Sequence, residues 1–328
     1  MASCEKSSEI SSPPIVDLFN HRPILAHNDA RNIVRSVKPL RASKHYPKML
    51  QASKLLIITK ENNGEDDKME INDLFDLSGK VVVVTGAGSG LGKAIAEAVA
   101  EAGADVVCAD INGETVSETG KLIEKYGHRV LVLQVDVSKE EEVKRMIDET
   151  VNNFGRLDVI FNNAGIAGPV KLAHETSIEE WNKVMDVNLT SVFLCCREAL
   201  KVMVKQKSGK IINTASIWGI VGGGNMLAVP PYTATKGGVI SFTKELAVEY
   251  GKYGINVNCI APGFFKTNIS RGGAHDPKWK ETIRAKTLIH GQAQPEDIKG
   301  TAIYLASKAS DFVTGHVLVI DDGYLAKA

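Results

Sequence analysis

The chain has 328 residues, of which 44% are hydrophobic, and its 39 basic and 39 acidic side chains give a formal net charge of zero. Such a balance excludes the strongly basic surfaces that bind nucleic acids or anionic membranes, and no apolar run reaches the ~18 residues that span a bilayer. The five cysteines form no C-x-x-C pair, so we expect buried thiols in a reducing, cytoplasmic compartment, with neither a disulfide framework nor a metal site.

The first 72 residues differ in composition from the rest of the chain. Five serines and a Pro-Pro pair stand before residue 15, basic residues outnumber acidic ones between Arg22 and Lys60, and an acidic, polar run follows at 61–67. We therefore predict an N-terminal extension and solvated linker at 1–72 and one folded domain at 73–328. Import into an organelle through the serine-rich extension remains an alternative, against which its acidic residues argue.

The segment 81–92, Val-Val-Val-Val-Thr-Gly-Ala-Gly-Ser-Gly-Leu-Gly, joins two predicted elements. Its four valines predict a strand buried on both faces, and the alanine-rich, proline-free residues 93–102 predict a helix. A glycine turn between them aims unpaired backbone N–H groups and the positive end of the helix at one point, where a diphosphate fits. We therefore predict a dinucleotide-binding loop formed by Gly86, Ser89, Gly90, Leu91 and Gly92.

The second predicted strand ends in Asp110, 24 residues after Gly86. A carboxylate at about this spacing accepts hydrogen bonds from the adenosine ribose hydroxyls and repels a 2′-phosphate. Neither 87–89 nor 111–113 contains an arginine or lysine that would bind that phosphate. The sequence therefore predicts NAD rather than NADP, with Ile111 as a further contact. The alternative interpretation of Asp110 is a solvated side chain at a strand end.

Strand patterns alternate with helix patterns from residue 74 onward. This alternation predicts parallel strands joined by right-handed crossovers, and hence an α/β, Rossmann-type doubly wound sheet of seven strands with helices on both faces. Ligands of such sheets collect at the carboxyl ends of the strands. The predicted strands are 81–84, 105–110, 129–135, 157–161, 210–214, 255–260 and 316–320, and the predicted helices are 93–102, 139–153, 177–206, 236–251 and 295–307.

A serine, a tyrosine and a lysine follow the fifth predicted strand. Ser216 lies just after the strand end, and Tyr232 and Lys236 stand four residues apart, on one face of the next helix. A phenol normally ionises at about pH 10, and an adjacent ammonium and a positive nicotinamide ring favour the phenolate, so we expect a lowered pKa for Tyr232. Such a tyrosine exchanges a proton with an alcohol or ketone oxygen that Ser216 holds in place. A second Tyr-x-x-x-Lys pair, Tyr304 and Lys308, follows no strand end and is interpreted as a packing tyrosine and a surface lysine.

Together these motifs resemble the classical short-chain dehydrogenase/reductase family, over residues 74–328 and in the family's order. The resemblance implies an NAD-dependent oxidoreductase that acts on a small-molecule secondary alcohol or ketone, with Ser216, Tyr232, Lys236 and Asn188 as catalytic residues. The residues that carry it are Thr85-Gly86-x-x-x-Gly90-x-Gly92, Asp110, Asp136, Asn162-Asn163-Ala164-Gly165, Asn188, Ser216, Tyr232-x-x-x-Lys236, Pro262-Gly263 and Thr267.

The resemblance also implies roles for individual residues. Asp136 and Val137 would contact the adenine, Asn188 would hold a water that links Lys236 to solvent, and Lys236 would also hold the nicotinamide ribose. For Asn188 a purely local structural role is the alternative. A homo-oligomer, either dimer or tetramer, would form through the helices 177–206 and 236–251. The remaining cofactor contacts would come from Asn163, Ala164, Gly165, Tyr232, Pro262, Gly263 and Thr267. The stretch 162–165 would also brace the sheet.

We expect the substrate loop at 264–294, hinged as a lid by Gly272-Gly273. Its polar and aromatic residues are Arg271, His275, Trp279, Arg284 and His290. The cations either bind a sugar-acid carboxylate or form a solvated face, and both interpretations stay open. Ser216 and Tyr232 are separated by 15 residues, a few more than is usual in the family. The extra length would fall at 222–224, in a glycine-rich insertion that faces the mouth of the substrate site.

The framework segments 74–80 and 307–315 most resemble gluconate 5-dehydrogenase and related sugar-acid dehydrogenases of the family. That likeness predicts a sugar, sugar acid or polyol as substrate. One alternative is a 3-oxoacyl-[acyl-carrier-protein] reductase, which usually takes NADP and so conflicts with Asp110. Another is a non-catalytic NAD-binding scaffold whose tail binds a partner, against which the intact Ser216, Tyr232 and Lys236 argue.

Overall fold

The computed structural model of this chain describes residues 70–223, 226–270 and 276–327. The predicted N-terminal extension therefore lies almost wholly outside the described residues. Within the described ranges, no helix is both long and apolar enough to cross a membrane. Four of the five cysteines fall in the described part and are buried free thiols, as expected, namely Cys108, Cys195, Cys196 and Cys259.

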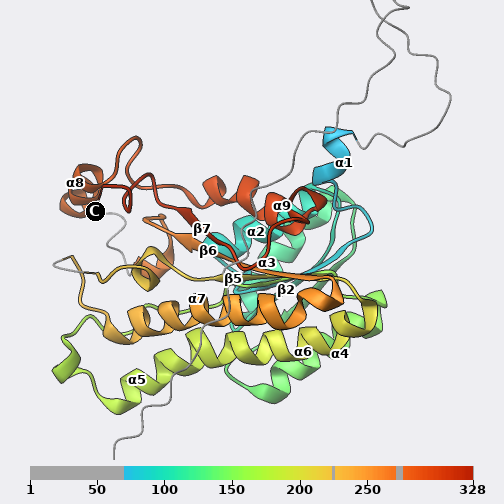
Figure 1. The fold of residues 1–328 in the computed structure, drawn as a ribbon, viewed down its shortest axis with the longest axis horizontal. Helices are drawn as coiled ribbons and strands as arrows, with labels where there is room; N and C mark the ends of the chain where they lie inside the picture. The colour runs from blue at the N-terminus through green and yellow to red at the C-terminus, as the bar shows by residue number, and fades with distance from the viewer. Residues whose placement is uncertain (1–69, 224–225, 271–275, 328) are drawn as a thin grey trace, which may run out of the picture. The chain divides into compact units, whose positions relative to one another are not determined.

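Seven parallel strands form one sheet in the order β3-β2-β1-β4-β5-β6-β7, which confirms the predicted fold class (Figure 1). The chain runs outward from β1 to β3 and then returns to the other side of β1, so a topological switch point lies between β1 and β4. The strands are β1 (Val81–Thr85), β2 (Asp105–Asp110), β3 (Val130–Gln134), β4 (Val159–Asn162), β5 (Gly209–Thr214), β6 (Ile255–Pro262) and β7 (Val317–Ile320).

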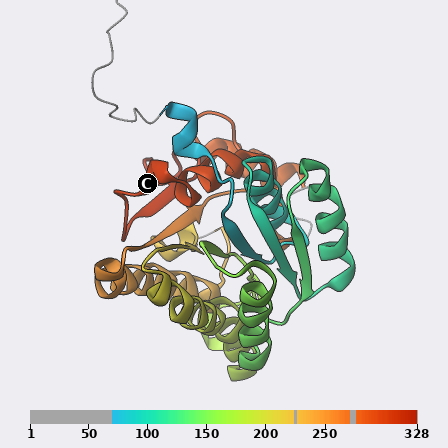
Figure 2. The ribbon, with the colours of Figure 1, turned by 90° about the vertical axis from the view of Figure 1, so that its right-hand side faces the viewer.

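Helices cover both faces of the sheet, as Figures 1 and 2 show. Strand β1 illustrates why, because its valines are buried and alternate between two hydrophobic clusters. Val83 packs with α4, α6 and α7, whereas Val82 and Val84 pack with α2, α3 and α9. The helices are α1 (Ile71–Phe75), α2 (Gly90–Glu101), α3 (Gly113–Ile123), α4 (Glu140–Phe154), α5 (Ile178–Met185), α6 (Ser191–Gln206), α7 (Pro230–Tyr250), α8 (Pro277–Lys286) and α9 (Lys299–Ala306).

Several helices differ from the prediction. α7 begins at Pro230 rather than at residue 236, because proline suits the first helical turn, where its fixed φ is helical and no N–H is needed. The predicted helix 177–206 contains a π turn at 186–190, in which the Ser191 N–H donates to the Asp186 carbonyl. The short helices α1, α3 and α8 were not predicted.

Candidate active site

Two adjoining cavities open at the carboxyl ends of the strands. The larger, which we call the strand-end cleft, has a volume of about 640 Å³ and follows the ends of β1, β2, β4, β5 and β6. The smaller, which we call the aromatic pocket, has a volume of about 180 Å³. Ser216 and Tyr232 line both cavities. A molecule in either cavity therefore meets these two hydroxyl groups at the shared wall.

The strand-end cleft brings together almost all residues predicted to bind a dinucleotide. Gly92 is the exception, because it is buried behind the loop, where a Cβ atom would collide with the Gly86 carbonyl oxygen. Gly92 thus lets α2 pack against the turn after β1. The predicted residues that line the cleft are Gly86, Ser89, Gly90, Leu91, Asp110, Ile111, Asp136, Val137, Asn163, Ala164, Gly165, Tyr232, Lys236, Pro262, Gly263 and Thr267.

The glycine turn leaves the N-terminus of α2 open toward the cleft. Gly86 has a φ of +69°, and a Cβ atom there would lie 2.9 Å from the Ala164 Cα, so only glycine fits. Ser89 precedes the helix and, within the described residues, its side chain makes no capping hydrogen bond. The first N–H groups of α2 therefore remain available to a ligand, and with the positive helix end they fit a diphosphate.

Asp110 stands at the end of β2, beside this turn. Its carboxylate accepts hydrogen bonds from the Gly88 N–H at 2.9 Å and the Asn112 N–H at 3.0 Å. The half-buried carboxylate thus holds the glycine turn while its remaining lone pairs face the cleft. Of the described residues that line the cleft, only Lys183 and Lys236 are cationic, and neither belongs to the turns after β1 or β2.

Hydrogen bonds around β4 brace the floor of the cleft. Asn163 donates its side-chain amide to the Thr85 carbonyl at 3.1 Å, and its own N–H donates to the Thr85 hydroxyl at 3.0 Å. Asn162 donates to the Asn213 side chain at 2.9 Å. On the far side, the Asp136 carboxylate accepts from the Ser138 N–H and hydroxyl at 3.0 and 2.7 Å. The strand ends are therefore held in fixed register around the site.

Lys236 is a buried cation that lines the strand-end cleft. Its ammonium donates to the Thr214 carbonyl at 2.7 Å and lies 5.6 Å from the centre of the Tyr232 ring. No carboxylate of the described residues comes within ion-pair distance of it, and burial lowers its pKa to about 8. An ammonium has three donors and this one spends a single donor on the protein, so it can bind further oxygen atoms in the cleft.

Tyr232 lies in the first turn of α7 and lines both the strand-end cleft and the aromatic pocket. The expected lowering of its pKa is not found. Burial raises the pKa of the Tyr232 phenol, and the hydrogen bond with Ser216 offsets that rise only in part. In the free protein, desolvation therefore outweighs the hydrogen bond that favours the phenolate.

Asn188 lies within the π turn and is fully buried. Its side-chain oxygen accepts from the Ile166 N–H at 2.8 Å, and its amide donates to the Ile166 carbonyl at 2.8 Å. The amide also reaches the Thr235 hydroxyl at 3.4 Å. Asn188 therefore fixes the segment after β4 from behind the cleft, and its side chain does not line either cavity. The water relay stays a prediction.

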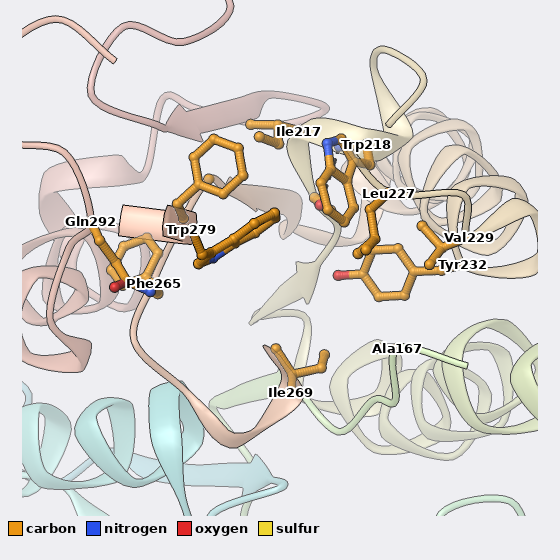
Figure 3. Close-up of a pocket in the computed structure, with 13 residues that line it drawn as sticks. Ala167, Ile217, Trp218, Leu227, Val229, Tyr232, Phe265, Ile269, Trp279 and Gln292 are labelled. Carbon is orange, nitrogen blue, oxygen red and sulfur yellow. Dashed lines mark hydrogen bonds between the residues drawn. The ribbon is translucent and has the colours of Figure 1, made fainter. Parts of the chain in front are cut away.

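The aromatic pocket lies beyond the Tyr232 hydroxyl. Figure 3 shows that hydroxyl pointing into the space between Leu227, Ile269 and Trp279, with Gln292 on the opposite side. Of the residues expected in the substrate loop, Trp279 lines the pocket. Arg284 instead donates to the Ile289 carbonyl, and His290 is exposed. Arg271, His275 and the predicted hinge 272–273 lie outside the described residues, as does Gly224 of the predicted insertion.

Several lining residues were missed by the sequence analysis. Trp218 follows Ser216 by two positions, so its place after a strand end was a signal that could have found it. The other residues come from segments far apart in the chain, and their composition carries no comparable signal. The lining residues outside the predicted substrate loop that were missed are Ala167, Ile217, Trp218, Leu227 and Val229. Within the predicted loop 264–294, the lining residues that were not singled out are Phe264, Phe265, Ile269 and Gln292.

Comparison with known proteins gives a consistent picture. The family model described as enoyl-(acyl carrier protein) reductase matches residues 86–325. The chain is 40% identical to 2-dehydro-3-deoxy-D-gluconate 5-dehydrogenase of Bacillus subtilis, over 78% of this chain and 99% of that protein. It is also 40% identical to cis-4-hydroxycyclohexanecarboxylate dehydrogenase of Sinomonas cyclohexanicum, over 75% of this chain and 97% of that protein.

A solved structure extends the likeness to three dimensions. A gluconate 5-dehydrogenase from Burkholderia cenocepacia, in complex with NADP and tartrate, superimposes with a TM-score of 0.74 at 32% identity. The match covers 79% of this chain and 100% of that one. The part of the chain that these relatives match is the part that carries both cavities.

Proposed function

The chain belongs to the short-chain dehydrogenase/reductase family of nicotinamide-dependent oxidoreductases, and on that premise we propose that it interconverts a secondary alcohol and a ketone with NAD, using Tyr232 as acid and base. The observation that carries the proposal is the shared wall between the two cavities. Tyr232 and Ser216 stand in it, and the Lys236 ammonium lies 5.6 Å from the Tyr232 ring. A substrate in the aromatic pocket would meet both hydroxyls.

The nicotinamide cofactor, when bound in the strand-end cleft, supplies or accepts the hydride. In the direction of reduction, Tyr232 gives its proton to the substrate oxygen while Ser216 donates a hydrogen bond to that oxygen and holds it in place. The raised pKa keeps the free phenol protonated and ready to donate. The buried Lys236 ammonium then stabilises the phenolate that remains, because two opposite charges attract strongly in a dry site.

The preference for NAD rests on Asp110. Its carboxylate is fixed by two backbone N–H groups and faces the cleft without a cation from the neighbouring turns. A 2′-phosphate placed there would meet a like charge. The Burkholderia relative holds NADP, so the relatives do not favour NAD and the proposal depends on this local arrangement.

The substrate class expected from the sequence, a sugar, sugar acid or polyol, is supported by the names of two relatives and stays a prediction. We also propose a homo-oligomer. Phe193 on α6 and Val248 on α7 expose 46% and 81% of their surface, and large exposed apolar side chains on two long helices favour an interface. Light scattering measures the state, and a monomer would contradict this proposal.

The test of the function is absorbance at the reduced-nicotinamide band with a panel of polyols, sugar acids, β-keto thioesters and simple ketones. We expect Tyr232→Phe to lower kcat by about 10²–10⁴-fold while the cofactor Kd stays nearly constant. Tyr304→Phe is the matched control, because Tyr304 belongs to the second Tyr-x-x-x-Lys pair and packs, partly buried, against the core. Cofactor binding without turnover of any compound would favour the scaffold alternative.

A further inference from the structure

The aromatic pocket is lined almost entirely by apolar side chains. Its hydrogen-bonding side chains are the hydroxyls of Ser216 and Tyr232, the carboxamide of Gln292 and the indole N–H groups of Trp218 and Trp279, and no charged side chain belongs to its described lining. The other lining residues are Ala167, Ile217, Leu227, Val229, Gly263, Phe264, Phe265 and Ile269. Apart from the reacting oxygen, a ligand in this pocket therefore meets a mostly apolar surface with a few neutral hydrogen-bonding groups.

Aromatic rings hold these walls in place. The Trp218 ring packs edge-on against Tyr232 at 6.3 Å and against Phe264 at 6.2 Å, measured between ring centres. Phe264 in turn packs edge-on against Trp279 at 6.1 Å and Tyr324 at 5.2 Å. Edge-to-face contacts are favourable beyond the area they bury. The pocket is therefore a preformed apolar surface rather than a loose opening that polar side chains could enter.

A polyol is poorly matched to such a surface. Each hydroxyl that leaves water without finding a partner lowers affinity by roughly one to two powers of ten. A buried carboxylate without a cation costs more, and Arg284 of the substrate loop donates to the Ile289 carbonyl, while no described cation of that loop lines the pocket. The volume sets the size of the ligand, because a dry apolar cavity of about 150 Å³ is enough for one benzene ring.

We propose that the aromatic pocket selects an uncharged alicyclic ketone or alcohol of about one ring, with at most one neutral polar group at its far end. That group meets Gln292, which lies across the pocket from the Tyr232 hydroxyl (Figure 3). The inference rests on the proposed function. In reduction the ring carbonyl carbon takes a hydride from the reduced nicotinamide, which is thereby oxidised, and the carbonyl oxygen takes the proton of Tyr232.

The decisive test uses the full chain and a pair of substrates of nearly the same shape, one neutral and one negatively charged. These are 4-oxocyclohexanecarboxamide and 4-oxocyclohexanecarboxylate, with cyclohexanone as the unsubstituted reference and 5-ketogluconate as the sugar acid. We expect kcat/KM for the amide to exceed that for the carboxylate by at least about tenfold, and that for the sugar acid by about a hundredfold. A carboxylate preference in the wild type, including one that Arg271→Ala removes, would overturn the inference.

Two variants at Gln292 locate the effect. Gln292→Leu should lower kcat/KM for the amide by about tenfold and leave cyclohexanone nearly unchanged, because a single neutral hydrogen bond is lost. Gln292→Arg should reverse the amide-to-carboxylate preference. If both variants leave the ratio between the two substrates at its wild-type value, the far end of the ligand does not meet Gln292 and the inference fails.

A binding measurement separates this inference from the proposed function. The unreactive analogue cyclohexanecarboxamide should quench tryptophan fluorescence of the chain saturated with NADH, more tightly than cyclohexanecarboxylate does. Trp279→Phe should diminish the quench, whereas Trp181→Phe, on α5 and outside the pocket lining, should keep it. Amide binding without turnover would refute the function and leave the ligand class standing. Turnover of sugar acids that depends on Tyr232 would support the function and refute the ligand class. Absence of binding by the amide would also refute the ligand class.

Discussion

The strand-end cleft and the aromatic pocket share a wall but are built in different ways. The cleft is lined by turns that directly follow strands, and much of its surface is backbone at glycine or small residues. The pocket is lined by large side chains that come from the turn after Ser216, the segment 226–229, the segment 263–269, α8 and Gln292. One cavity depends on local turns, and the other depends on packing between distant segments.

This difference teaches where each kind of specificity resides. A turn at a strand end can offer N–H groups and a carboxylate to a ligand whatever the rest of the chain does. A hydrophobic wall needs several segments to be in place together. We therefore expect substitutions in the cleft to change chemistry or cofactor choice, and substitutions around the pocket to change substrate affinity.

The largest effect is expected at the shared wall. Lys236→Met should lower kcat by about 10²–10⁴-fold, because the phenolate loses the cation that stabilises it. The same change should stabilise the free protein at pH 7. Burial lowers the pKa of Lys236 to about 8 from an ordinary 10.5, and that shift costs the folded state on the order of 3 kcal/mol. Loss of the hydrogen bond from Lys236 to the Thr214 carbonyl offsets about 1 kcal/mol of this gain in stability.

The predicted difference in stability between the wild type and Lys236→Met depends on pH. Between pH 8 and pH 10.5 the unfolded chain holds a proton on Lys236 that the folded chain has released, so the wild type gains stability as pH rises through that window. Lys236→Met lacks this gain. Urea unfolding of the free proteins at intervals across the window measures the difference between them. A variant less stable than the wild type at pH 7, or parallel curves, would contradict the predicted cost of burial.

The fold could be predicted from sequence because its signals are local. The valines of β1 are buried as their composition indicates, and all seven predicted strands are present in the sheet. The helices that were not predicted have physical reasons for being overlooked. Asn112 caps the start of α3, because its side chain accepts hydrogen bonds from the Glu114 and Thr115 N–H groups. A pattern based on apolar spacing does not use this capping signal.

The candidate site divides along the same line. Gly86 and Asp110 were identified because spacing along the chain defines their turns, and both line the cleft. The direction of the Tyr232 pKa shift in the free protein was not predicted, since it depends on how deeply the folded chain buries the ring. Nor was the apolar nature of the pocket, because Ile269 and Trp279 become neighbours of Leu227 only when three segments pack together.

A smaller effect is expected at the adenosine end of the cleft. Asp110→Ala should lower the ratio of kcat/KM for NAD over NADP by about 10–100-fold, since charge-assisted hydrogen bonds to ribose are lost and repulsion of the 2′-phosphate disappears. Asp110 also holds the Gly88 N–H, so Asp110→Asn is the matched control, which keeps an acceptor and removes the charge. It should shift the ratio in the same direction with less damage to Tm. An unchanged ratio in both variants would refute the ribose role.

The smallest effect is expected at the outer support of the aromatic pocket. Asp322, in a left-handed conformation with a φ of +54°, accepts from the N–H groups of Ile289, His290 and Gly291 at 3.2, 2.7 and 2.7 Å. These bonds fix the strap that precedes Gln292. Burial acts to raise the pKa of Asp322, but the three N–H donors outweigh it and lower the pKa below its ordinary value. The support is therefore present above the ordinary carboxyl pKa and is lost as pH falls through the lowered one.

Asp322→Ala should raise KM for the pocket's substrate about two- to fivefold while kcat and the cofactor Kd stay near wild type, because a few hydrogen bonds at a half-exposed site are worth only about 1 kcal/mol in net terms. Asp322→Asn retains a side-chain oxygen and tolerates the left-handed backbone, so its KM should stay within about twofold of wild type. Steady-state kinetics at pH 7 with saturating cofactor measures both variants. Asp322→Ala could instead weaken cofactor binding as much as it raises KM. In that case the two cavities are not independent, and the distinction between a cleft built from local turns and a pocket built by distant packing fails.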